Sequence, residues 1–165
     1  MRQEEGEVIY HIGKGVKLGR GVKVWHFAYV GDYAEIGDNV SIGSLAHVDY
    51  KTVIGENTRI AGLAYIPPLS VIGRNVFIGP AAVLTNDRYP LSKRLEGVKI
   101  EDGAVVGAKA VIGSGLTVGR NSVVGMGAVV TKDVPPETVV MGNPARPVYS
   151  RSEYEKKKDA WEKSL

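Results

Sequence analysis

Aliphatic side chains recur at every sixth position over most of the chain. The series begins with thirteen consecutive Ile, Val or Leu residues: Ile12, Leu18, Val24, Val30, Ile36, Ile42, Val48, Ile54, Ile60, Ile66, Ile72, Ile78 and Leu84. After an interruption it resumes with six more: Ile100, Val106, Ile112, Val118, Val124 and Val130. A helix of 3.6 residues per turn would spread these positions around its whole surface, so the period of six argues against an α-helix.

A second restricted position lies four residues after each aliphatic one, and it is usually small or β-branched, as at Ala28, Thr52 and Ala110. One bulky and one small inward position per six residues predict a short strand and a turn, repeated around a narrow interior. With three hexads per coil, the nineteen hexads predict an all-β, three-sided parallel β-helix of about six coils. It would be roughly 30 Å long at the usual strand spacing. The alternative is a β-sandwich with coincidental spacing, which nineteen matches in two registers disfavour.

The repeat breaks after Leu84, because the next inward position of that hexad would be Arg88. A charged side chain in a narrow apolar interior would be very costly. The chain is therefore expected to leave the coil as an external loop over about residues 85–99 and to rejoin it near Ile100. Loops raised on a rigid scaffold often carry binding and catalytic groups, although a tolerated surface insertion is the alternative.

A second break follows Val130, where Gly gives way to Pro in VVTKDVPPETVVMGNPARPV. We expect residues 1–148 to form the β-helix domain with its loop at 85–99, and residues 149–165 to form a helical tail. Tyr154 and Trp161 lie seven residues apart, so one side of this helix could dock on a neighbouring surface.

Composition and charge narrow the function classes. The chain has 21 Gly but only two Phe and two Trp, which fits a thin, regularly turning structure. Its net charge of +3 suits a small anionic ligand, but no cluster of basic residues before the tail suggests nucleic-acid binding. The absence of Cys excludes disulfides, thiolate nucleophiles and Cys-ligated metals. With no signal-like N-terminus and no long apolar run, we expect a cytoplasmic protein that does not bind membranes.

Several segments resemble known enzymes. The second repeat block followed by VVTKDVPPETVVMGNPARPV resembles the C-terminal half of hexapeptide-repeat acyltransferases. VWHF at 24–27 and NVFIGPAAVLTNDRYP at 75–90 resemble nucleotide-sugar N-acetyltransferases that act on UDP-2-acetamido-3-amino-2,3-dideoxyglucuronate or dTDP-3-amino sugars. The resemblance spans about residues 9–148. It implies a left-handed coil, acetyl-CoA as co-substrate, and a homotrimer whose active sites lie between neighbouring prisms. One departure is Ala61-Gly62-Leu63, where the family is expected to have a polar stretch.

The resemblance, together with the chemistry of the side chains, predicts roles for particular residues. Asn86 would hold the sugar amine, and Asp87 is a weaker candidate for a catalytic base. The acceptor would contact three further residues: His26, Arg88 and Tyr89. Backbone groups would grip the pantetheine arm of CoA at four residues: Gly107, Ala108, Gly125 and Ala128. Lys132 and Arg146 would meet the CoA phosphates, a role that suits their charge, although a solvated role is the alternative.

The three histidines bear on the mechanism. Counting coils places His47 about three coils from Asn86, roughly 14 Å away and outside hydrogen-bond reach. An amine needs less activation than a hydroxyl, so the pattern favours N-acetylation by direct attack on the thioester without a His base. An O-acetyltransferase acting on a sugar or another small hydroxyl compound, and a non-catalytic scaffold, remain alternatives. A zinc carbonic anhydrase of the same fold needs three suitably spaced His ligands, and the spacing of His11, His26 and His47 does not supply them, so no metal site is expected.

Overall fold

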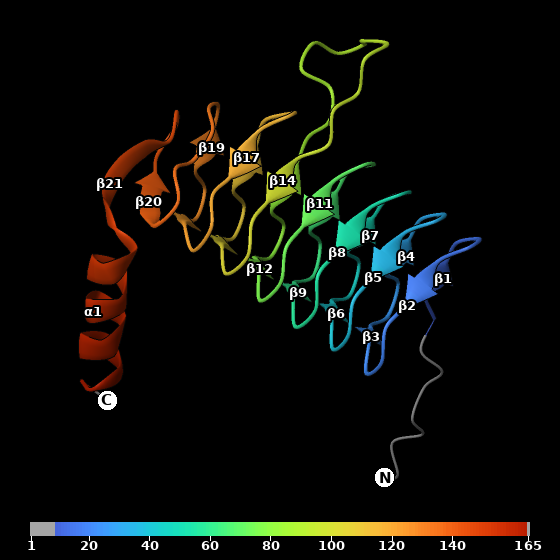
Figure 1. Ribbon diagram of the computed structural model, residues 1–165, viewed down its shortest axis with the longest axis horizontal. Helices are drawn as coiled ribbons and strands as arrows, with labels where there is room; N and C mark the ends of the chain where they lie inside the picture. Colours follow the sequence, from blue (N-terminus) through green and yellow to red (C-terminus); the bar gives the residue numbers. More distant parts are fainter. Residues whose placement is uncertain (1–8, 165) are drawn as a thin grey trace, which may run out of the picture.

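The computed structural model describes residues 9–164 as a left-handed parallel β-helix with a C-terminal helix at one end (Figure 1). Sheet A contains β1 (His11–Ile12), β4 (Tyr29–Val30), β7 (His47–Val48), β10 (Tyr65–Ile66), β13 (Val83–Leu84), β16 (Val111–Ile112) and β19 (Val129–Val130). Sheet B contains β2 (Lys17–Leu18), β5 (Glu35–Ile36), β8 (Val53–Ile54), β11 (Val71–Ile72), β14 (Lys99–Ile100) and β17 (Thr117–Val118). Sheet C contains β3 (Lys23–Val24), β6 (Ser41–Ile42), β9 (Arg59–Ile60), β12 (Phe77–Ile78), β15 (Val105–Val106), β18 (Val123–Val124), β20 (Thr138–Met141) and β21 (Arg146–Ser150).

The six-residue pattern sets the direction of each side chain. The first residue of each two-residue strand points outward, and the second, the periodic aliphatic residue, points into the prism. Equivalent residues of successive coils stack on one another, as Ile54, Ile72 and Ile100 do in sheet B, and all three are buried. Leu18 is an exception, because it lies on the edge strand of sheet B, where no earlier strand within residues 9–164 covers it.

Glycine follows many of the inward aliphatic residues because the next coil lies too close for a side chain. A Cβ atom at Gly79 would lie only 2.6 Å from the backbone nitrogen of Ala108. Two residues later, most corners pass through the left-handed region, as at Ala81 with φ of 54°. Glycine at these positions therefore avoids a clash with the backbone of the next coil.

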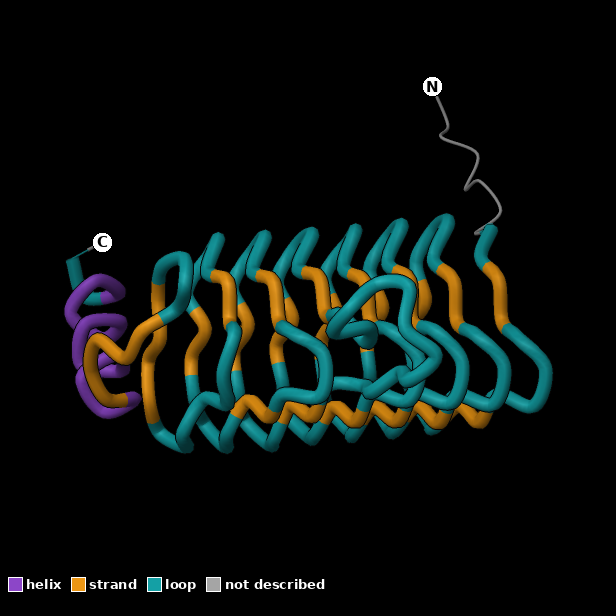
Figure 2. The backbone as a smooth tube through the Cα atoms, turned by 90° about the horizontal axis from the view of Figure 1, so that it is seen from above, coloured by secondary structure: helices purple, strands orange, loops and turns teal. Residues whose placement is uncertain are grey.

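The external loop leaves the prism after β13 and returns at Val98. Val98 is only 1% exposed, and its N–H donates to the hydroxyl of Ser70 in the previous coil. Val98 thus fills the inward position that Arg88 would otherwise have taken, while Arg88 is exposed outside the prism. Figures 1 and 2 show the loop standing outside the regular coils, as the break in the repeat predicts.

The prism has about seven turns, one more than the hexad count predicts, because β20 continues the stack on β18. Strand β21 then pairs antiparallel with β20 and leads into α1 (Arg151–Glu162). The hydroxyl of Ser150 caps α1 by accepting the N–H of Glu153, and the Arg151 guanidinium donates to the carbonyl of Asn121 on the prism. None of the helices in residues 9–164 is long and apolar enough to cross a membrane.

Candidate active site

The three corners of the prism differ in chemistry. We call them the AB, BC and CA corners after the sheets they join. The BC corner carries a charged ladder in which Arg20 pairs with Asp38 and Arg74 with Asp102. Hydrogen bonds from each arginine, first from its backbone N–H and then from its guanidinium, lower the pKa of both carboxyl groups. These four charges are thus paired within the chain, and the candidate site residues lie on the other two corners.

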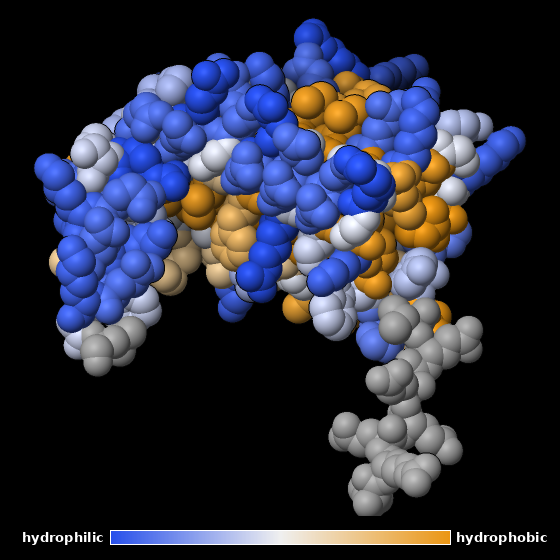
Figure 3. All heavy atoms as spheres, turned by 60° about the horizontal axis from the view of Figure 1, so that its bottom comes forward, coloured by the Kyte–Doolittle hydropathy of each residue, from blue (hydrophilic) through white to orange (hydrophobic). Residues whose placement is uncertain are grey.

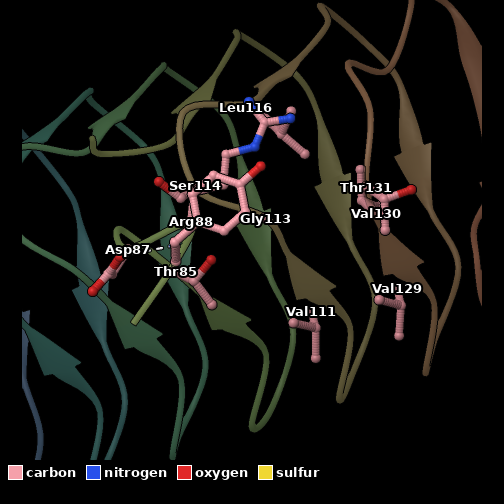
Figure 4. A pocket seen from close by; sticks show the side chains of 11 residues that line it. Thr85, Asp87, Arg88, Val111, Gly113, Ser114, Leu116, Val129, Val130 and Thr131 are labelled. Atoms are coloured by element: carbon pink, nitrogen blue, oxygen red, sulfur yellow. Dashed lines mark hydrogen bonds between the residues drawn. The ribbon is translucent and has the colours of Figure 1, made fainter. Parts of the chain in front are cut away.

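The external loop projects from the AB corner and covers a cavity over the following two coils (Figure 4). The cavity is lined by residues of the loop, the AB corner and sheet A: Thr85, Asp87, Arg88, Tyr89, Val111, Gly113, Ser114, Leu116, Val129, Val130 and Thr131. Arg88 and Tyr89, the predicted acceptor contacts, therefore lie together at one cavity. Tyr89 is 76% exposed, so its ring is accessible to a ligand.

Asn86 lies at the base of the loop. Its backbone carbonyl accepts the N–H of Glu96 at 2.8 Å, which closes the two ends of the loop against each other. The side-chain amide of Asn86 is half-buried and makes no hydrogen bond within residues 9–164. Asn86 is not among the residues that line the loop cavity.

Asp87 has a different environment. One carboxylate oxygen accepts the N–H of Tyr89 at 3.0 Å, and the other accepts the N–H of Ser92 at 2.9 Å. Figure 4 marks the first of these bonds with a dashed line beside Asp87. Both oxygens of Asp87 thus shape the loop.

The residues predicted to contact pantetheine lie along the CA corner, on the opposite edge of sheet A. The N–H groups of Gly107 and Gly125 donate to carbonyls of the next coil, and the N–H of Ala128 donates to the carbonyl of Gly125. The Ala128 side chain is fully buried. Within the described residues, the N–H of Ala108 has no partner and remains available to a ligand amide.

Met126 is a candidate contact that the sequence reasoning missed. It occupies the same corner position as Ala108 in the next coil, and its N–H also has no partner in the described part of the chain. Its side chain is 83% exposed. The 18-residue period of the coil was the signal that could have identified it.

Lys132 and Arg146, predicted to meet phosphate groups, are brought together at the C-terminal end of the prism. Both line a cavity that also contains Asp133. This cavity shares Val130 with the loop cavity, so the two adjoin along the AB side of the last coils. The fold thus places two cations beside the cavity that the loop covers.

The histidines lie away from the loop cavity. His11 and His47 are on the outer face of sheet A, where Tyr29 stacks between them at 4.7 and 4.5 Å. His26 lies at the first CA corner. Strand β7, which carries His47, is two strands from β13, so His47 is two coils from the start of the loop and not three. The separation is about 10 Å, still beyond a hydrogen bond.

Two other ionisable groups lie beside His47. The carboxylate of Asp49 lies 3.5 Å from His47 Nε2. Burial, followed by the effect of this carboxylate, raises the pKa of Tyr65. Among residues 9–164, no group of three or more His, Cys, Asp or Glu side chains could hold a metal ion.

A coiled prism built from six-residue repeats defines a class of repeat protein, and comparison of the sequence with family models identifies the same class. The model described as "Bacterial transferase hexapeptide (six repeats)" matches residues 10–44 and 33–68. The model described as "Hexapeptide repeat of succinyl-transferase" matches residues 97–132. Together they match more than half of the chain. The protein belongs to the hexapeptide-repeat family of bacterial transferases.

Solved structures share this fold. PerB from Caulobacter crescentus, in complex with CoA and GDP-perosamine, is 24% identical with a TM-score of 0.56, over 86% of this chain and 58% of PerB. A variant of AntD, an N-acyltransferase from Bacillus cereus in complex with dTDP-4-amino-4,6-dideoxyglucose and coenzyme A, is 15% identical with a TM-score of 0.66, over 92% of each chain. The acetyltransferase domain of PglB from Neisseria gonorrhoeae is 24% identical with a TM-score of 0.54, over 84% of this chain and 54% of that chain.

Proposed function

We propose that the protein is an acyltransferase that moves the acetyl group of acetyl-CoA to the amine of a nucleotide-linked amino sugar. The observation that carries this proposal is the adjoining pair of cavities on the AB side, one beneath the loop and one containing Lys132 and Arg146. The first offers room for an acceptor, and the second offers charge for CoA phosphates. Similarity to structures that contain CoA with a nucleotide sugar supports the same substrates.

The proposed reaction needs no His base. The neutral sugar amine attacks the thioester carbonyl, the C–N bond forms, the C–S bond breaks, and the departing CoA thiolate takes up the proton released by nitrogen. Asn86 would orient the amine through its unpartnered side-chain amide. Catalysis then rests on alignment of the two substrates and on polarisation of the carbonyl by backbone N–H groups.

We further propose that the working form is a homotrimer. Asn86 and the unpartnered N–H of Ala108 lie on opposite edges of sheet A within one chain. If three copies turn sheet A toward a common axis, the AB corner of one copy meets the CA corner of the next. Exposed apolar side chains flank sheet A on both of these corners, including Leu63 and Leu69, which suits burial between copies.

A screen of amino-sugar nucleotides tests the proposal. UDP- and dTDP-linked amino sugars are each mixed with acetyl-CoA, and release of the CoA thiol is followed. We expect release with at least one amine and none with the matching hydroxyl sugar. Release with hydroxyl sugars alone would point to O-acetylation, and release with neither would contradict a transferase that uses sugar nucleotides.

Binding of the donor can be measured separately. Acetyl-CoA at a hundred times its dissociation constant should stabilise the folded protein by about 2.7 kcal/mol. A thermal-shift titration measures this effect. A melting temperature that does not change with acetyl-CoA would indicate a non-catalytic scaffold.

A further inference from the structure

A second groove lies on the outer face of sheet C in the early coils, away from the loop cavity. Its floor is formed by Lys23, Ser41 and Arg59, which lie in direct register on β3, β6 and β9. Figure 3 shows this side of the molecule, where hydrophilic and hydrophobic surfaces lie next to each other. The groove borders the CA corner.

The two cations of this groove are uncompensated. Neither Lys23 nor Arg59 forms an ion pair within residues 9–164, and no carboxylate lines the groove. On sheet B, in contrast, Lys17 pairs with Glu35 at 2.6 Å. The Arg59 guanidinium lies 5.8 Å from the centre of the Phe77 ring. Two long cationic side chains about 10 Å apart at their Cα atoms, with a hydroxyl between them, can converge on adjacent phosphate groups.

An aromatic ring stands beside these cations. Trp25 begins the first CA corner and is 49% exposed. The equivalent positions in the next two coils are Gly43 and Ala61, and all three residues line the groove. The indole therefore lies next to a surface formed by small residues. A planar base can stack on such a ring without specific hydrogen bonds.

The groove also leads toward Ala108, which is expected to contact the pantetheine arm of CoA. Gly62 and Pro80, on its border, share one CA-corner position with Ala108, and backbone hydrogen bonds connect these coils. The carbonyl of Pro80 accepts the N–H of Lys109, next to Ala108, at 2.9 Å. A ligand in the groove would therefore extend along the same corner toward the residue expected to meet pantetheine.

We propose that this groove binds a nucleoside diphosphate, with its phosphates held by Lys23, Ser41 and Arg59 and its base against Trp25. The inference extends the proposed function and rests on it for the sugar attached to the nucleotide. It also gives a role to Ala61-Gly62-Leu63, because small residues at 61 and 62 leave space for the base where a polar stretch was expected.

Intrinsic fluorescence can report this binding directly. The chain has two Trp and eight Tyr residues, so Trp161→Phe leaves Trp25 as the only tryptophan, and excitation at the red edge of the absorption band, where tyrosine does not absorb, selects its emission. UDP, dTDP and GDP are titrated into this protein, with inorganic pyrophosphate as the comparison. We expect saturable quenching by at least one nucleotide and weaker binding of pyrophosphate. Lys23→Gln and Arg59→Gln should each weaken nucleotide binding about tenfold, as expected for a charge-assisted contact.

The matched control removes the same charge elsewhere. Lys156→Gln/Lys163→Gln changes two exposed cations of the C-terminal tail and should leave nucleotide binding unchanged. Equal nucleotide affinity in Lys23→Gln/Arg59→Gln and the parent would overturn the inference, as would the failure of all three nucleotides to bind.

Acetyl transfer separates this inference from the proposed function. If Lys23→Gln/Arg59→Gln raises KM for the nucleotide sugar and leaves kcat near the parent value, both the nucleotide groove and the acetyltransferase function are supported. If the parent transfers acetyl groups and this variant has an unchanged KM, the groove is excluded while the function stands. If nucleotides bind through Lys23 and Arg59 but no acceptor yields thiol release, the groove stands and the transferase proposal fails.

Discussion

Asn86 and Asp87 are neighbours in the chain, yet their side chains differ in hydrogen bonding. Asp87 accepts two N–H groups of its own loop, whereas the amide of Asn86 has no partner in the described residues. A side chain already engaged by its loop is a weak candidate for proton transfer, and an unengaged amide is a good candidate for positioning a substrate. The local hydrogen bonds therefore favour Asn86 as the residue that orients the acceptor.

Asn86→Ala should lower kcat by about a hundredfold or more, because a misplaced amine loses alignment with the thioester. Binding of acetyl-CoA, read as a thermal shift, should be retained. Lys93→Ala, in the exposed part of the same loop, is the control and should keep normal turnover. Near-normal turnover in Asn86→Ala would remove this residue from the mechanism.

Asp102 governs a pH effect on stability. The backbone N–H of Arg74 and its guanidinium bind the carboxylate at 2.8 and 2.9 Å and lower its pKa below 3.8. The unfolded chain thus binds this proton more tightly than the folded protein. The resulting stability is present above pH 3.8 and is lost as the pH falls through the lower pKa of the folded state. Since both side chains are accessible to water, solvent screening keeps the contribution of this pair to stability small.

Asp102→Asn should therefore lower the melting temperature at pH 7 and flatten the loss of stability as the pH falls below 3.8. Thermal unfolding at a series of pH values measures both effects. Asp159→Asn, on the exposed side of α1, is the comparison. An equally steep acid dependence in Asp102→Asn and the parent would contradict the assignment.

At the scale of elements, the loop and the prism are separable. The regular corner between inward positions has three residues, as in Gly37-Asp38-Asn39, and the loop replaces those three with residues 85–97. Val98 restores the inward position at once, so the coils on either side continue in register. The loop is an insertion that the prism does not need for its own packing.

Replacing residues 85–97 with Gly-Asp-Asn should preserve the β-helix and abolish acetyl transfer. Circular dichroism and the melting temperature should match the parent, because every inward position is kept. Thiol release with the accepted amino sugar should be absent. Loss of the fold would show that the loop stabilises the prism, and retained transfer would show that it is a passive insertion.

At the scale of the whole molecule, exposed apolar side chains gather on the two corners that flank sheet A, whereas charged pairs occupy the BC corner. This asymmetry gives the prism one side suited to contact with other copies and one side suited to water. In the proposed trimer, the candidate donor and acceptor residues, which lie on opposite edges of sheet A within one chain, would meet across the contact between neighbouring copies.

Light scattering should therefore give about 53 kDa, the mass of three 17.7 kDa chains. Leu63→Glu places a charge on the CA corner, where Leu63 is 59% exposed, and should give monomers. Val71→Glu, on the outer face of sheet B, should remain trimeric. A monomeric parent protein with full activity would contradict a site shared between copies.

The sequence by itself determined the coil, its three faces and the position of the loop. Period-six inward residues leave no other way to bury one large and one small side chain per hexad, and Arg88 cannot enter that interior. The sequence could not determine which corners meet. It placed Lys132 and Arg146 only by resemblance, and it gave no sign that Asp87 is bound by its own loop.

Only the tertiary structure decided which side chains lie together. Residues on one corner are separated by 18 positions in the sequence, or by 28 where the loop intervenes, as for Pro80 and Ala108. Their alignment depends on how many residues each coil contains. The groove of Lys23, Arg59 and Trp25 arises in the same way, from three coils stacked in register. The repeat fixes the shape of each coil, and the stacking of coils selects which side chains share a ligand.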